Sequence, residues 1–172
     1  PVRLAFRALE QEGLLEKAGK RGYVVRRFSE ADVRAAIEVR GTLEGLAARR
    51  ACQNITDREI DQLKGFFRQF AGLRDIGDIK AYAREDRRFH NLLTGIGAKE
   101  FLKSILETYN IISFSYQTVL SEGLVRSPNE TIREHLAIIE AISNRDADSA
   151  ERLMRQHLNN SAAVLRQSLK EE

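Results

Sequence analysis

Residues 82–93 read Tyr82-Ala83-Arg84-Glu85-Asp86-Arg87-Arg88-Phe89-His90-Asn91-Leu92-Leu93, which is the pattern of a helix with one apolar face. Asp86 and His90 fall on that apolar face four residues apart, so both side chains point in the same direction. A carboxylate that points into a core is costly unless another group pairs with it. The other two histidines of the chain, His135 and His157, also fall on apolar helix faces. The sequence therefore predicts one polar site in the middle of a helical bundle.

These four side chains are candidate metal ligands. A buried imidazole needs hydrogen-bond partners for its nitrogens, or a metal ion. One aspartate and three histidines from three helices suit a divalent ion, with zinc as our expectation and nickel, manganese or iron as alternatives. In the competing interpretation each histidine is satisfied separately within the core. The combination of all three with an inward aspartate favours the metal.

Arg40 is a second inward charge, on the apolar face of the helix that residues 30–53 predict. It could form an ion pair with Asp86 or with Glu44. It could equally hold an anion such as a ligand carboxylate, because a planar guanidinium matches the geometry of that group. The sequence leaves both interpretations open.

Residues 100–121 predict a long apolar helix on which Ser113 and Tyr116 face roughly inward. Their hydroxyls could contact a bound ligand, with core packing as the favoured role of Tyr116. The sequence shows no nucleophile-with-base motif, glycine-rich phosphate loop or Cys-x-x-Cys pair. An enzyme would therefore have to work through the metal.

The fold class we predict is mainly α, an antiparallel helical bundle. Two prolines, no tryptophan and long segments rich in Ala, Leu, Ile, Glu and Arg favour helix. Capping boxes at Ser29 with Asp32 and at Thr56 with Glu59 predict two of the helix starts. The six helices expected after Ser29 cover residues 30–53, 56–73, 79–94, 100–121, 127–143 and 149–169.

The N-terminal residues predict a different unit. Residues 1–12 have the pattern of a helix that ends at Gly13, and residues 23–28 have that of the return strand of a hairpin with its turn at residues 18–22. A helix followed by a hairpin is the second half of a winged helix-turn-helix. The helices that should precede it are missing, so we expect the sequence to begin inside a longer protein.

The basic character of the chain belongs to this unit. Residues 1–28 hold seven Lys and Arg against three Glu, a net charge of +4, whereas the rest of the chain carries −1. An isolated basic segment indicates a polyanionic binding partner such as DNA. The alternative is a basic tail that is only solvated. The cations expected nearest DNA are Arg3 and Arg7 on the helix and Lys20 and Arg21 at the hairpin tip.

The composition argues against a membrane protein, a secreted protein and a disulfide-rich protein. No apolar run approaches the roughly 18 residues that a membrane span needs, and no signal peptide is visible. The single cysteine, Cys52, excludes an internal disulfide framework and fits a reducing cytoplasm.

Residues 1–15 and 22–25 resemble the recognition helix and wing of GntR-family transcription regulators. The remainder is similar to the FCD ligand-binding domain of the FadR subfamily. Its marks, in chain order, are Glu38-Val39-Arg40 with Leu43-Glu44 and Ala47-Ala48, Asp86-x-x-Phe89-His90, Glu134-His135 and His157-Leu158.

The resemblance implies that Asp86 and the three histidines bind a divalent metal, and that the metal receives the carboxylate of a small organic acid. It carries Arg40 over as a contact of that carboxylate and Gly22 as part of the DNA-binding wing. It implies a homodimer on operator DNA with no membrane partner. The long-chain acyl-CoA regulator that names the subfamily lacks this metal set, which argues against an acyl-CoA ligand.

The function we expect is that of a DNA-binding transcription regulator, a repressor with an activator as the alternative, and not an enzyme. Residues 1–28 would form the DNA-binding part, and residues 29–172 the effector-binding and dimerisation domain. A metal-dependent hydrolase or lyase on a helical bundle is the alternative. Four candidate ligands without an obvious spare base favour the regulator.

Overall fold

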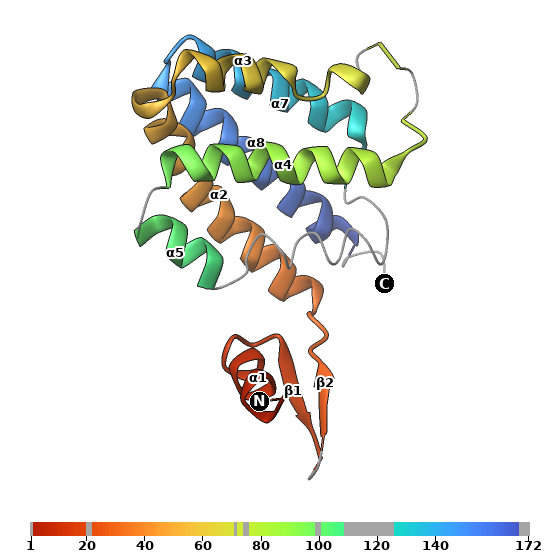
Figure 1. The fold of residues 1–172 in the computed structure, drawn as a ribbon. Coiled ribbons are helices and arrows are strands. Elements are labelled where there is room, and N and C mark those ends of the chain that lie inside the picture. Colours follow the sequence, from red (N-terminus) through yellow and green to blue (C-terminus); the bar gives the residue numbers. More distant parts are fainter. Residues whose placement is uncertain are drawn as a thin grey trace.

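A small N-terminal unit of one helix and two strands precedes a bundle of helices (Figure 1). The computed structural model describes residues 2–19, 22–70, 72–73, 76–98, 101–108 and 126–168. The N-terminal unit consists of α1 (Val2–Gln11), β1 (Leu15–Ala18) and β2 (Gly22–Val25). The bundle consists of α2 (Glu30–Asn54), α3 (Asp57–Gly65), the short 3-10 helix η1 (Arg68–Phe70), α4 (Ile79–Gly97), α5 (Phe101–Thr108), α7 (Pro128–Ser143) and α8 (Ala147–Ser168). Across these described residues, none of the helices combines the length and apolar character that a membrane crossing requires.

The predicted helix and hairpin of the N-terminal unit are confirmed, but the return strand ends at Val25 and does not reach residue 28. Gly13 ends α1 with a φ of 73°, a left-handed conformation that glycine adopts without steric cost. β1 and β2 pair antiparallel, with Leu15 opposite Val25. The Tyr23 ring of β2 stacks on Phe6 of α1 at a centroid distance of 5.4 Å, which fastens the hairpin to the helix.

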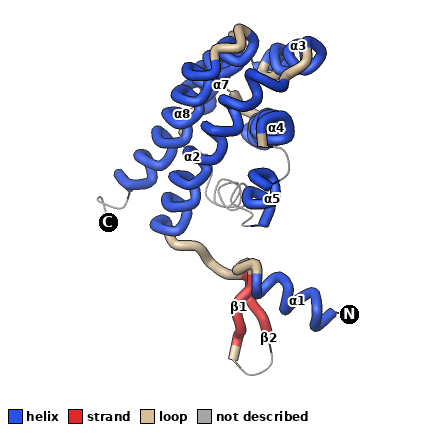
Figure 2. Tube along the Cα trace, turned by 90° about the vertical axis from the view of Figure 1, so that its left-hand side faces the viewer, coloured by secondary structure: helices blue, strands red, loops and turns tan. Residues whose placement is uncertain are grey.

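Helix α2 is the central helix of the bundle. It begins near the hairpin and runs between the other helices (Figure 2). Its predicted start is confirmed, since Ser29 and Asp32 form a reciprocal capping box. Gly41 and Gly45 lie where α2 packs against α8. A β-carbon on Gly45 would lie 2.6 Å from the Arg155 side chain of α8, and one on Gly41 would lie 3.6 Å from the Leu158 β-carbon.

Helix α4 crosses α2 at very short range. A β-carbon on Gly97 would lie 1.8 Å from the backbone oxygen of Ala47, so only glycine allows this approach. The prediction that α4 ends at Thr94 is therefore wrong, because the helix continues through Gly95 to Gly97. Glycine in a helix costs stability, but the packing against α2 compensates for that cost here.

The predicted helix over residues 56–73 is also shorter than expected. Its capping box at Thr56 is confirmed, but α3 ends at Gly65. Phe66 is extended and Phe67 is left-handed, with a φ of 62°. This reversal turns both rings into the core, where Phe66 is 4% exposed and Phe67 is 1% exposed. The burial of two adjacent aromatic rings overrides the helical pattern of the sequence.

Candidate metal centre

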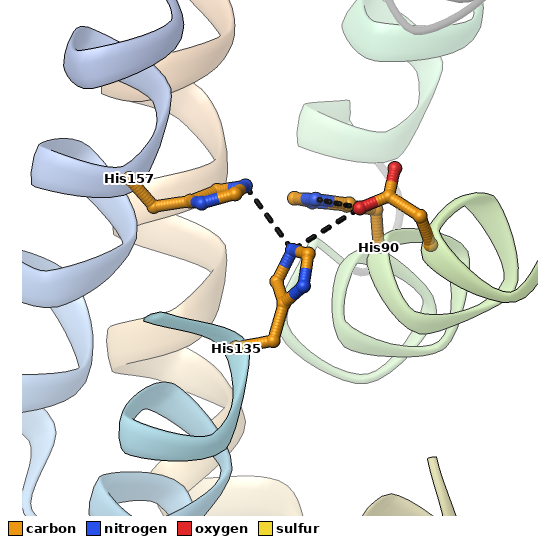
Figure 3. A group of neighbouring side chains, drawn as sticks. His90, His135 and His157 are labelled. Atoms are coloured by element: carbon orange, nitrogen blue, oxygen red, sulfur yellow. Dashed lines mark hydrogen bonds and ion pairs between the residues drawn. The ribbon is translucent and has the colours of Figure 1, made fainter. Parts of the chain in front are cut away.

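The four predicted ligands come together in the middle of the bundle. Asp86 and His90 lie on α4, His135 on α7 and His157 on α8. Figure 3 shows the three imidazoles, carried by three different helices, converging on one point. One ligand atom from each of the four residues lies within 4.8 Å of each of the others. All three histidines are buried, and Asp86 is partly buried.

The spacing of these atoms fits a single metal ion. His135 Nε2 lies 3.1 Å from an Asp86 carboxylate oxygen and 3.2 Å from His157 Nε2. His90 Nε2 lies 3.8 Å from the same Asp86 oxygen. Two ligand atoms held about 2.1 Å from an ion, at octahedral or tetrahedral angles, are about 3.0–3.4 Å apart. The cluster is therefore already close to the geometry that a shared divalent ion requires.

Glu44 of α2 orients His90. The Glu44 carboxylate lies 2.5 Å from His90 Nδ1, which directs Nε2 of the same ring towards the cluster. Arg40, one turn earlier on α2, donates from Nε to the other Glu44 oxygen at 2.7 Å. Both Arg40 and Glu44 are buried. Burial opposes the Glu44 charge, but Arg40 and His90 outweigh it and hold the pKa of Glu44 at about 2.

Glu134 of α7 orients His157 in the same way. A Glu134 carboxylate oxygen lies 2.7 Å from His157 Nδ1. The Arg126 guanidinium donates to both oxygens of Glu134, at 2.7 and 2.8 Å, and the Asn160 amide donates at 2.7 Å. Burial opposes this charge too, but the hydrogen bonds from His157, Arg126 and Asn160 hold the pKa of Glu134 well below its usual range.

His135 has different surroundings. None of the described residues offers a hydrogen-bond partner to its Nδ1 atom, which is buried. The Phe67 ring stacks on the imidazole at a centroid distance of 4.6 Å and an interplanar angle of 3°. Phe89 packs against the same imidazole at 4.9 Å. Aromatic packing thus surrounds the one histidine that lacks a carboxylate on its Nδ1 atom.

The electrostatics of the cluster favour metal binding. Burial lowers the pKa of His135 and of His157, and the neighbouring His135 lowers that of His157 further. Both imidazoles are therefore neutral near pH 7, which is the form that binds a metal. Three imidazoles and one carboxylate are a donor set suited to zinc and to other divalent transition metals.

The predicted DNA and effector contacts are residues other than the four candidate metal ligands. Arg3 and Arg7 are exposed on α1, Gly22 begins β2, and Arg40 is buried beside Glu44. The remaining predicted contacts lie outside the described residues; they are Lys20, Arg21, Ser113 and Tyr116. Of the two interpretations of Arg40 as an ion-pair partner, the structure shows the pair with Glu44.

Two carboxylates of this site had no predicted role as supports of the histidines. The sequence predicts Glu44 only as a possible ion-pair partner of Arg40, and it marks Glu134 only as the residue before His135. The sequence feature that indicates a supporting role for Glu44 is its position four residues after Arg40, on the same inner face of the helix. An inward Arg and Glu on a helix that faces three histidines could have suggested a supporting carboxylate.

The chain matches the FCD domain family over residues 35–160, a range that contains all four candidate ligands. It is 32% identical over 174 residues to the HTH-type transcriptional repressor RspR of Escherichia coli, which covers 97% of this chain and 73% of that protein. The chain belongs to the GntR family of transcription regulators and carries an FCD domain.

Solved structures share the fold of this FCD-domain regulator. E. coli McbR/YncC has a TM-score of 0.80 at 19% identity and covers 98% of this chain and 80% of its own. A GntR family member from Pseudomonas syringae has a TM-score of 0.63 at 24% identity and covers 99% of this chain and 70% of its own. The curated relatives are transcription regulators and not enzymes, which removes the hydrolase or lyase alternative.

Proposed function

We propose that this protein is a DNA-binding transcription repressor whose helical domain, residues 29–172, binds a divalent metal and a small organic acid. The acid modulates the affinity for operator DNA, which the protein binds as a homodimer through residues 1–28. The observation that carries the proposal is the convergence of four ligand atoms from Asp86, His90, His135 and His157 within 4.8 Å, inside the range that matches the FCD domain.

The metal we propose is zinc, with nickel, manganese and iron as alternatives. Asp86 Oδ1 and the Nε2 atoms of the three histidines would hold it. The ion would offer a Lewis-acidic position to an incoming carboxylate. Support comes from Glu44 and Glu134, since a metal-binding histidine characteristically donates the N–H of its second ring nitrogen to a carboxylate.

The effector class we propose is a small carboxylate, with Arg40 as its second contact. Arg40 lies in the buried chain of contacts that leads through Glu44 to His90, so it is close to the cluster. The guanidinium is suited to a planar carboxylate. Ser113 and Tyr116 remain proposed contacts of the acid.

The DNA-binding role of residues 1–28 is supported by their shape and charge. The helix and hairpin pack together through Phe6 and Tyr23, and the segment carries a net charge of +4. Arg3, Arg7, Gly22 and the hairpin-tip residues Lys20 and Arg21 are the proposed contacts. A relative with 32% identity is named as a repressor, which supports the same direction of regulation here.

The decisive experiment is elemental analysis of protein purified without added metal. We expect about one equivalent of a divalent transition metal in the natural protein and a large loss in His157→Ala, which also loses stability because a cavity replaces a buried ring. The exposed neighbour Gln156→Ala is the matched control and should keep the metal. Less than about a tenth of an equivalent in the natural protein, with none taken up from added salts, would overturn the proposal.

A further inference from the structure

We propose that Phe67 is a positioning residue for the metal ligand His135, and that its stacked ring restrains the rotation of that imidazole, as the carboxylates of Glu44 and Glu134 do for the other two histidines. This inference rests on the proposed metal centre. It assigns a role to a side chain that offers no ligand atom and comes from the turn after α3.

The first observation is an asymmetry among the three imidazoles. His90 and His157 each have a carboxylate oxygen at their Nδ1 atom, at 2.5 and 2.7 Å. Such a contact fixes both the tautomer and the rotation of the ring. His135 Nδ1 is buried and has no hydrogen-bond partner among the described residues, so another contact must set the orientation of that ring.

The second observation is the stack itself. Phe67 lies face to face with His135, with ring planes within 3° of parallel and centroids 4.6 Å apart. Phe89 packs against the imidazole from a different direction, at an interplanar angle of 59°. Rotation of the His135 ring about its last bond would collide with one or the other phenylalanine. The pair therefore holds Nε2 directed at Asp86 and His157.

The third observation is the backbone of Phe67. Its φ of 62° lies in the left-handed region, which a bulky residue adopts only at a cost in free energy. Its backbone N–H points towards a Glu85 carboxylate oxygen 3.5 Å away, and its own carbonyl accepts from Phe70 at 3.0 Å. A glycine or asparagine would suit this backbone better. The sequence has phenylalanine there, and the ring it provides lies on His135.

The neighbouring Phe66 is a natural control. It is also buried, at 4% exposed against 1% for Phe67, and packs on Phe89 at 5.9 Å, but its ring is not among those stacked on His135. Replacing either phenylalanine by leucine removes a similar volume from the same part of the core. Only the Phe67 replacement removes the stack.

The experiment compares Phe67→Leu with Phe66→Leu in Co²⁺ titrations followed by visible absorption. We expect Phe67→Leu to weaken Co²⁺ binding about tenfold and to change the ligand-field bands, because the imidazole no longer has a fixed orientation. Phe66→Leu should keep the natural spectrum and affinity. Thermal unfolding of the metal-free proteins should show a similar loss of stability in both variants. Should Phe67→Leu fail to fold, Phe67→Met takes its place as a milder loss of the ring.

A second measurement, NMR on the metal-free protein, tests the role of Phe67 independently of the metal centre. The ring protons of His135 should be shifted upfield in NMR spectra of the natural metal-free protein, by the ring current of Phe67, and should lose that shift in Phe67→Leu only. An unchanged His135 shift, or identical Co²⁺ spectra and affinities for the two leucine variants, would overturn the inference. If the natural protein binds no Co²⁺, the proposed metal centre fails, and the NMR result alone decides whether Phe67 positions the ring.

Discussion

The Glu44 carboxylate of α2 lies 2.5 Å from His90 Nδ1 of α4, and both residues are almost completely buried. This contact joins a histidine of the metal cluster to the helix that follows directly from the N-terminal hairpin. Arg40 continues the chain of contacts along α2, with 2.7 Å between its Nε atom and Glu44. Helix α2 therefore connects the cluster of candidate ligands to the N-terminal unit.

The first prediction concerns Glu44. Glu44→Gln should lower metal affinity roughly 10- to 100-fold, because the amide keeps the shape of the side chain but loses the charge that supports His90. Glu38→Gln, on the exposed side of the same helix, should leave the affinity unchanged. Competition against a chromogenic chelator measures both.

Glu44→Gln also leaves the Arg40 charge in the core without its carboxylate, so the variant should lose stability as well. The double variant Arg40→Met with Glu44→Gln removes both charges together. It should regain part of that stability while metal binding stays weak. A double variant that recovers full metal affinity would show that the first effect came from the orphaned charge and not from His90.

The second prediction concerns the effector. If Arg40 holds the carboxylate, Arg40→Ala should abolish the change in operator affinity that the acid causes, while the metal stays in place. Arg40→Lys keeps the charge but not the planar fork, so it should retain only part of the response. Isothermal calorimetry with candidate carboxylates, with and without metal, separates the two contacts. An acid that binds metal-free and metal-loaded protein equally tightly would contradict the mechanism.

The third prediction tests the crossing of α2 and α4. Gly97→Ala should destabilise the fold by at least about 2 kcal/mol, because the new β-carbon would overlap the Ala47 carbonyl and force the helices apart. Gly95→Ala, two residues away on α4, meets no atom within 4 Å and should stabilise by about 0.5–1 kcal/mol. Urea unfolding of both variants gives the comparison, and equal effects would refute the close approach.

The fourth prediction concerns DNA. Arg3→Ala should weaken binding to the operator roughly tenfold to a hundredfold if Arg3 contacts a base edge. Arg58→Ala removes the same charge from the exposed surface of α3 and is the control. A Lys20 and Arg21 double alanine variant tests the hairpin tip in the same titration. Operator affinity that survives both N-terminal changes would remove the DNA-binding assignment of these residues.

The parts of the fold that the sequence predicted are those set by short-range chemistry. The capping boxes at Ser29 and Thr56 and the turn at Gly13 each depend on residues within a few positions of one another. The metal cluster was predictable as well, since Asp86 and His90 share one helix face and the other histidines fall on apolar faces. Each of these features is visible as a local pattern.

The parts that were missed depend on contacts between distant segments. Glycine normally weakens a helix, and only the close approach of the Ala47 backbone of α2 explains the glycine at position 97 of α4. Phe67 fits a helical pattern until His135, from a later helix, provides a surface for its ring. Glu134 has no periodic feature that reveals its contact with His157. Contacts between distant segments determine the end of α4, the turn at Phe67 and the role of Glu134. A periodic pattern in the sequence does not show such contacts.

The capping box at Ser29 starts α2 at Glu30, shortly after β2 ends at Val25, and the helix then continues without a break past Glu44 at the candidate metal cluster. Glu44 lies 14 residues after Glu30, and at 1.5 Å per residue that arm is about 21 Å long. A tilt of about 5° pivoting at Glu44 would displace the far end of the arm by about 2 Å, because an α-helix of this length transmits rotation as a nearly rigid body. In the proposed regulator, a tilt of α2 that a bound acid causes at the metal cluster would therefore move the end of the helix that adjoins the hairpin.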